Sequence, residues 1–326
     1  MSMILDGSNG VTFNDSSLQG AAASPYVLKN KLINGAMVID QRNAGASQTF
    51  TAAAAVAYTV DRWYGSCTGA NITGQRVAGT SPNQYAYKFT GAASNTGTLF
   101  GQRIESFNTY DLISTTVTGS VRLSSSSITS VTWTAYYANT SDTFSAKTSI
   151  ATGTLTITST PTVYSFSFNA GANAGNGIAI EFSTGALTAT NTLQYENAQL
   201  EIGTSATPFE RRLYNQELAN CQRYYWQGGN GSPGIMNGAT TARYSVILPI
   251  TMRATPTTTA IAAPIIINPT VAEQQTGSQT TNFGVTGYGA SVNYSVAQIG
   301  FGGFSSGADG RATTLLNTSL AFSSEL

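Results

Sequence analysis

The sequence predicts an all-β protein: a jelly-roll β-sandwich and a C-terminal β-sandwich, joined by one short helix. Three observations lead to this prediction. Apolar and polar residues alternate along many short runs, and clusters of Gly, Asn and Ser separate these runs. Charged residues make up 9% of the 326 residues, far below the roughly 25% of an average globular chain. Ser, Thr, Asn, Gln and Gly replace them, and these residues favour strands and turns over helices.

Residues 1–30 are expected to form an N-terminal attachment segment. Two short apolar runs, Met3–Leu5 and Val11–Phe13, flank the turn-forming DGSNG, which predicts a small hairpin. Two short strands alone are marginal in water, so we expect this hairpin to dock on a neighbouring sheet. The candidate attachment residues are Ile4, Leu5, Val11 and Phe13.

Residues 31–210 are expected to form the jelly roll. VTWTAYY places Val131 and Trp133 on one face of a strand, and GIAIEF places Ile178, Ile180 and Phe182 on one face. In TLQYENAQLEIG the alternation slips at Asn197–Ala198, which predicts a β-bulge.

Residues 211–227 are expected to form the junction helix, and residues 228–326 the C-terminal β-sandwich. Asn215 can cap the helix, and Thr207, followed by Pro208, is the alternative start. Seven of the chain's thirty charged residues lie between Glu196 and Arg223. The sequence therefore concentrates its ions around this helix.

The composition excludes several kinds of function. Without histidine there is no serine or cysteine triad of the usual kind and no His-containing zinc site. Two cysteines, Cys67 and Cys221, allow one disulfide but favour two buried thiols. We expect no cofactor, no catalytic residue and no metal site, although Asp40 or Glu196 is an alternative ligand of a structural calcium ion. Four carboxylates of the first β-domain have no spacing that pairs them for glycoside hydrolysis: Asp40, Asp61, Glu181 and Glu196.

Partners and location are also restricted by the composition. The net charge is zero and no basic block exists, so nucleic-acid binding is not expected. No run approaches the ~20 apolar residues of a membrane span, and the first residues lack the features of a secretory signal. We expect synthesis in a cytoplasm and no membrane insertion.

Several motifs resemble known families. AQLEIGTSATPFERR resembles the final strand and exit of carbohydrate-binding-module-like jelly rolls, and LINGAMVIDQR followed by YTVDRWY resembles their opening. The order YNQELANCQRYYW, ILPITMRATPTTT, FSSEL resembles tail-fibre and related virion surface proteins of tailed phages, as does GVTFNDSSLQGAA near the start. The resemblance implies a β-rich, commonly trimeric protein on the virion exterior, on the tail or the capsid surface. Glycan binding is implied more weakly, because the jelly roll serves many functions.

Candidate residues follow from this interpretation. Tyr136 and Trp226 are the candidate glycan contacts, because both are large aromatics that can escape the core. The charged helix can be an ordinary surface helix or part of a homotrimer seam, and we favour the seam. The candidate seam residues are Glu210, Arg211, Arg212, Tyr214, Leu218, Cys221 and Tyr225.

The preferred function is a trimeric tail fibre that contacts host-surface glycans. The alternatives are a capsid decoration or head-fibre protein docked through its N-terminal segment, a free carbohydrate-binding module, and a glycan-degrading enzyme. The host, the glycan, the position on the particle and the β-domain that binds are not predicted.

Overall fold

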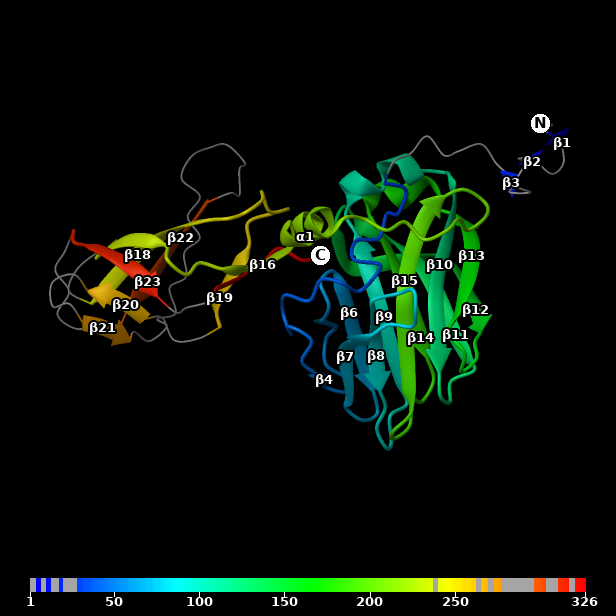
Figure 1. Ribbon diagram of the computed structural model, residues 1–326, viewed down its shortest axis with the longest axis horizontal. Coiled ribbons are helices and arrows are strands. Elements are labelled where there is room, and N and C mark those ends of the chain that lie inside the picture. The colour runs from blue at the N-terminus through cyan, green and yellow to red at the C-terminus, as the bar shows by residue number, and fades with distance from the viewer. Residues whose placement is uncertain are drawn as a thin grey trace.

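Antiparallel β-sheets dominate the fold. The computed structural model describes residues 4–6, 10–12, 18–19, 28–236, 240–261, 265–268, 273–276, 296–302, 310–316 and 320–326. Figure 1 shows a large sandwich on one side of the short helix α1 (Tyr214–Gln222) and a smaller β-unit on the other. The predicted fold class is confirmed.

The large sandwich is a jelly roll of two six-stranded sheets. One has the order β13 (Thr162–Asn169), β10 (Thr116–Ser125), β15 (Thr192–Ile202), β8 (Tyr85–Thr90), β7 (Ile72–Ala78) and β4 (Gln48–Phe50). The other has the order β12 (Thr143–Thr156), β11 (Ser130–Thr140), β14 (Ile178–Thr184), β9 (Gly97–Ile104), β6 (Trp63–Thr68) and β5 (Ala57–Tyr58). Three short 3-10 helices connect strands at one end: η1 (Ser106–Asn108), η2 (Tyr110–Leu112) and η3 (Ala172–Asn176).

Aromatic side chains fill the space between the two sheets. Trp63 stacks on Phe100 at 4.8 Å between ring centroids, and Trp133 stacks on Phe166 at 4.2 Å. Burying each such side chain contributes roughly 1.5–3 kcal/mol. The predicted inward face of β14 is confirmed, since Ile178, Ile180 and Phe182 are all buried.

The predicted bulge at Asn197–Ala198 is confirmed. Ser120 of β10 pairs with Gln199, but Arg122 pairs with Glu196, so β15 carries the extra residue. Asn197 has a φ of 47°, a left-handed conformation that Asn tolerates better than most residues.

The junction helix is shorter than predicted. It covers Tyr214–Gln222, and Leu213 precedes it at the N-cap without a side-chain cap, so neither Asn215 nor Thr207 caps it. Tyr225 and Trp226 belong to strand β16 (Tyr225–Gly228), which pairs with β24 (Leu320–Ser323). Pairing with a strand about one hundred residues away therefore overrides the helical spacing of the last predicted turn.

The smaller unit contains a three-stranded and a six-stranded sheet. The three-stranded sheet has the order β16, β24, β19 (Thr257–Ala260). The six-stranded sheet has the order β21 (Glu273–Thr276), β20 (Ile265–Asn268), β23 (Ala312–Leu316), β17 (Pro233–Met236), β18 (Thr241–Ile247) and β22 (Val296–Gly302). Its core includes Met236, Tyr244, Phe301, Leu315 and Phe322.

The N-terminal hairpin is confirmed for the backbone. Strand β1 (Ile4–Asp6) pairs with β2 (Gly10–Thr12), and β2 pairs with a third strand, β3 (Leu18–Gln19). Ile4, Leu5 and Val11 lie in these strands, with their side chains outside the described part of the structure, and Phe13 lies outside the described residues.

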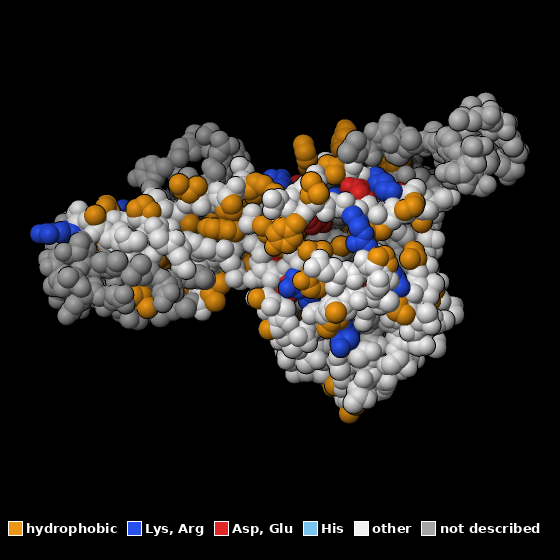
Figure 2. Space-filling model, in the orientation of Figure 1, with side chains coloured by type: hydrophobic (Ala, Val, Ile, Leu, Met, Phe, Trp, Pro, Cys, Tyr) orange, Lys and Arg blue, Asp and Glu red, His pale blue; other side chains and the backbone are white. Residues whose placement is uncertain are grey.

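Charge is sparse on the face shown in Figure 2, where most side chains are uncharged. Within the described part of the chain, no helix is both long enough and apolar enough to cross a bilayer.

Candidate functional site

A leading segment, residues 29–40, crosses one end of the jelly roll before its first strand. Asn30 fixes it to β15, because its Nδ2 donates to the carbonyl of Ala198 at 3.1 Å and its Oδ1 accepts the N–H of Leu200 at 3.0 Å. Gly35 is needed at the crossing, since a Cβ there would lie 2.1 Å from the Ala198 oxygen. The segment therefore lies directly against the bulge of β15.

An exit segment, residues 203–213, runs back along the same strand. The N–H of Thr207 donates to Oε1 of Glu201 at 2.8 Å, and the N–H of Glu210 donates to Oε1 of Gln199 at 2.8 Å. Buried polar side chains of β15 thus supply partners for a segment that has no regular secondary structure of its own.

Arg212 joins the two segments to the helix. Its guanidinium lies 3.3 Å from Glu210 and 3.2 Å from Glu217 of α1, and it donates to the carbonyls of Asn30 and Leu32. Its side chain is only 8% exposed. We call Arg212, Glu210 and Glu217 the Arg212 centre. Such buried pairs need complete hydrogen bonding to be stable, and here the backbone carbonyls provide it.

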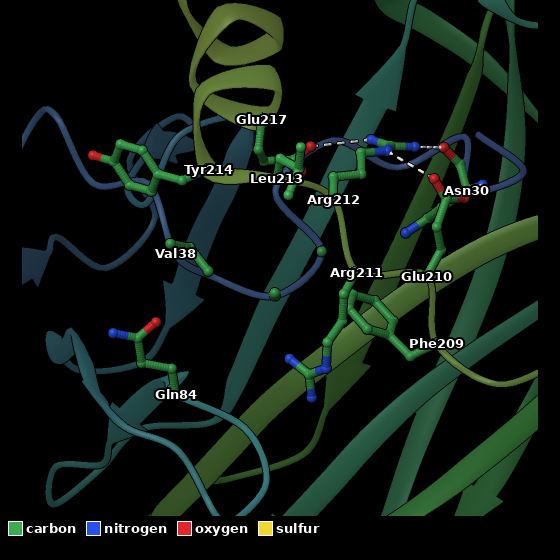
Figure 3. A pocket seen from close by; sticks show the side chains of 12 residues that line it. Asn30, Val38, Gln84, Phe209, Glu210, Arg211, Arg212, Leu213, Tyr214 and Glu217 are labelled. Carbon is green, nitrogen blue, oxygen red and sulfur yellow. Dashed lines mark hydrogen bonds and ion pairs between the residues drawn. The ribbon is translucent and has the colours of Figure 1, made fainter. Parts of the chain in front are cut away.

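A pocket of about 300 Å³ opens beside this centre. Figure 3 shows Phe209 and Arg211 of the exit segment on one side of it, Val38 and Gln84 on the other, and α1 above them. Arg211 lies beside Phe209, 5.8 Å from its ring centroid, and donates to Oδ1 of Asn83 at 2.7 Å. A second cavity of about 350 Å³ lies against the same exit segment and is lined by Leu28, Lys29, Glu210, Arg211, Arg212, Leu213 and Gln216.

Aromatic rings and planar polar groups line the pocket. Phe209 and the 58% exposed Tyr214 supply aromatic faces, and Gln84 and Arg211 supply planar polar groups. The two lining carboxylates, Glu210 and Glu217, are both paired with Arg212, and each accepts a main-chain N–H, from Asn30 and Asn34 respectively. Both carboxylates are therefore held in fixed positions.

The predicted glycan contacts, Tyr136 of β11 and Trp226 of β16, lie outside this pocket. Tyr136 is on the outer face of β11, half-buried, with the Lys147 ammonium 4.1 Å from its ring centroid. Trp226 stacks on Phe322 at 5.3 Å and packs against the core of the smaller unit. Neither lines the pocket.

The predicted seam residues are divided by the structure. Glu210 and Arg212 pair inside one chain, and Cys221 and Tyr225 are buried inside it. The partners of these four side chains lie within the same chain, and their place in a trimer seam stays a prediction. Leu218 is half-buried, and Arg211 and Tyr214 are exposed and line the pocket.

Other charged groups and the cysteines have structural roles. Cys67 and Cys221 are free and buried, as favoured. Burial raises the pKa of the Cys221 thiol well above its usual value, and nearby Asp61 and Glu217 add to the effect. The calcium candidates are occupied by protein donors: Asp40 accepts the N–H groups of Asn43 and Gly45, and Glu196 accepts from Thr80, Asn83 and Gln194. Among the described residues, no three acidic or Cys side chains gather as a metal site would require.

Among the pocket residues that the sequence analysis missed are Asn30, Val38, Gln84 and Phe209. Phe209 had a signal, because a large apolar residue between Pro208 and three charged residues has no strand or helix in which to be buried. The others had none, since they come close to Phe209 only through folding.

Comparison with known proteins gives similar folds only. No protein-family model and no curated protein matches the chain. Solved structures of carbohydrate-binding-module jelly rolls are similar to about half of it. One is a family 4 carbohydrate-binding module, at 14% identity over 52% of this chain and 98% of that one, with a TM-score of 0.32. Another is a family 61 module in complex with β-1,4-galactotriose, at 12% identity over 54% and 99%, with a TM-score of 0.35. Tailspike protein 4 of bacteriophage CBA120 is similar at 12% identity over 56% of this chain and 22% of that one, with a TM-score of 0.34.

Proposed function

We propose that this protein is a non-enzymatic structural virion protein of a tailed phage, a trimeric tail fibre that binds a host-surface glycan. The observation that carries the binding part is the open pocket between the jelly roll and α1. It combines the aromatic faces of Phe209 and Tyr214 with the planar polar groups of Arg211 and Gln84.

A glycan fits this combination of groups. The C–H face of a sugar ring packs on an aromatic ring, and its hydroxyls pair with amide and guanidinium groups. A volume of about 300 Å³ is at the lower end of the usual range for ligand pockets, about 300–1,000 Å³. The pocket therefore suits one or two sugar rings rather than a long chain.

Attachment to a particle is supported by the N-terminal strands and the motif order. Strands β1 to β3 have two or three residues each, too few to be stable without a neighbour. We propose that they dock on another virion protein, on the tail or, alternatively, on the capsid shell. Trimerisation, with Arg211 and Tyr214 as the exposed seam candidates, would multiply weak sites through avidity.

A glycan array with the full chain tests the binding. We expect Phe209→Ala to reduce glycan affinity about tenfold or more, because it removes one stacking face. Phe107→Ala is the matched control, since Phe107 is 85% exposed and outside the pocket, and it should bind as the wild type does. Equal binding by both variants, or no glycan bound, would count against the proposal.

The oligomeric state and the position on the virion are tested separately. Light scattering should give three times the 34.0 kDa of one chain, and a monomeric mass would remove the trimer. Antibody labelling of virions in the electron microscope should mark the tail, and labelling of the capsid would support the alternative position.

A further inference from the structure

Residues after β24 leave the smaller unit and lie against the jelly roll. In Figure 1 the C-terminal end of the chain lies near α1, between the two units. The N–H of Ser324 donates to the carbonyl of Tyr224 at 2.8 Å, and Arg253 Nε donates to the carbonyl of Ser324 at 2.9 Å. These bonds direct the next two residues towards the jelly roll.

The carboxylate of Glu325 sits between two arginines of the jelly roll. It pairs with Arg42 at 3.0 Å and directly contacts Arg62. Both arginines are held in place by other groups: Arg42 lies 3.6 Å from the ring centroid of Tyr225, and Arg62 lies 3.5 Å from that of Tyr224. The Arg62 side chain is 1% exposed. We call Glu325 and its two arginines the Glu325 centre.

Leu326 occupies the adjoining apolar surface. Its side chain packs against a small buried cluster on the outer face of β11, β12 and β14, formed by Ala138, Phe144, Ala179 and the half-buried Tyr136. Its main-chain oxygen accepts from the Tyr58 hydroxyl at 2.8 Å and from Arg103. One short segment is thus held by a carboxylate, an apolar side chain and a main-chain oxygen.

The jelly roll supplies more donors here than this segment uses. Three buried guanidinium nitrogens have no hydrogen-bond partner: Nη1 of Arg42, Nε of Arg62 and Nε of Arg103. Nη1 of Arg42 lies 3.8 Å from Oδ1 of Asp61, and the three arginines together form a cationic surface that is suited to an anionic ligand. The positions of the arginines are set by jelly-roll strands and aromatic rings as well as by Glu325.

We propose that this surface is a binding site for a short acidic–leucine peptide, occupied in the same chain by Glu325 and Leu326. The occupied site acts as a latch that holds the smaller unit against the jelly roll. It is distinct from the pocket at Phe209 and does not depend on glycan binding.

Peptide binding to the full chain tests the site. The double variant Glu325→Ala/Leu326→Ala empties it, and the probe is a fluorescein-labelled peptide, Phe-Ser-Ser-Glu-Leu, with an amidated end. We expect the double variant to bind this peptide at least tenfold more tightly than the wild type, whose site is filled. The peptide with Gln in place of Glu, and the peptide with Ala in place of Leu, should each bind at least tenfold more weakly.

Two results would overturn the proposal. One is equal or absent binding of the peptide by the wild type and the double variant, up to millimolar concentration. The other is binding that ignores the Glu-to-Gln change. Small-angle X-ray scattering tests the latch itself: the double variant should show a larger maximum dimension than the wild type, and an unchanged curve would remove the latch. The near-ultraviolet circular dichroism spectrum checks that the variant is folded.

Discussion

The Arg212 centre and the Glu325 centre use opposite compositions for the same task. In the first, one arginine holds two glutamates; in the second, one glutamate holds two arginines. Each fixes a segment without regular structure to the jelly roll. At these two places, in a chain with only 9% charged residues, ion pairs therefore hold segments that no regular secondary structure holds.

The two centres differ in the additional contacts that their side chains make. Arg212 also satisfies two main-chain carbonyls, of Asn30 and Leu32. Glu325 is bound only by arginines that have further partners, since Arg42 lies over Tyr225 and Arg62 donates to the carbonyl of Arg103 at 2.6 Å. Loss of the central residue should therefore cost more in the Arg212 centre.

Arg212→Ala is expected to have the largest effect. It leaves two carboxylates without their cation and two carbonyls without a donor, so the free energy of unfolding should fall by about 3–5 kcal/mol. Urea denaturation followed by tryptophan fluorescence measures this. Arg211→Ala is the neighbouring control and should cost about 1 kcal/mol or less, because Oδ1 of Asn83 keeps a second donor in Asn197. Equal losses of unfolding free energy in the two variants would show that the Arg212 centre does not hold these segments in place.

Glu325→Ala should have a smaller effect, a loss of about 2–3 kcal/mol from the same kind of measurement. Each arginine keeps another partner, and only the bonds to one carboxylate disappear. Glu273→Ala, a change in strand β21 at the far side of the smaller unit, serves as the comparison. If Glu325→Ala destabilised the protein more than Arg212→Ala, the ranking of the two centres would be reversed.

The strands and the inward aromatic faces could be predicted because their signal is local. Alternation placed Trp133 and Phe182 in the core, and a one-residue slip located the bulge at Asn197. Trp226 was misplaced because its partner strand, Leu320–Ser323, lies almost one hundred residues further along the chain. No local pattern reports such a pairing.

The two ion clusters were harder to predict, because their contacts also join residues that are far apart in the sequence. Charged residues are normally exposed, so Arg62, which is fully buried, gives no sign of its burial in the sequence. Arg212 was identified as a member of an ion cluster, but its carbonyl partners lie about 180 residues earlier, in the leading segment. Composition therefore located the cluster, and only the fold defines which chain segments it joins.

Cys221 lies between the two centres and can report which of them holds helix α1. It is one helical turn after Glu217 and on the same buried face, and burial keeps its pKa high. In a Cys67→Ser background, we expect almost no labelling of the native protein by a thiol reagent, because only the thiolate reacts. Arg212→Ala should accelerate labelling about tenfold more than Glu325→Ala does. Faster labelling of Cys221 in Glu325→Ala than in Arg212→Ala would show that the Glu325 centre holds helix α1 in place.

The smallest expected effect is a pH dependence from Asp61, which lies 3.8 Å from Arg42. Burial raises the pKa of Asp61 above its ordinary value of 3.8, although Arg42 and hydrogen bonds from Gln41 oppose this. The folded state thus binds the proton more tightly than the unfolded state. This contribution to stability is present below pH 3.8 and is lost as the pH rises through the folded pKa.

The Asp61→Asn variant isolates this contribution. The stability of the wild type relative to Asp61→Asn should decline as the pH rises from about 4 to about 7, measured by urea denaturation at each pH. A constant difference would mean that Asp61 has the same pKa in both states. A rising difference would mean that Arg42 and the hydrogen bonds from Gln41 outweigh the cost of burying Asp61.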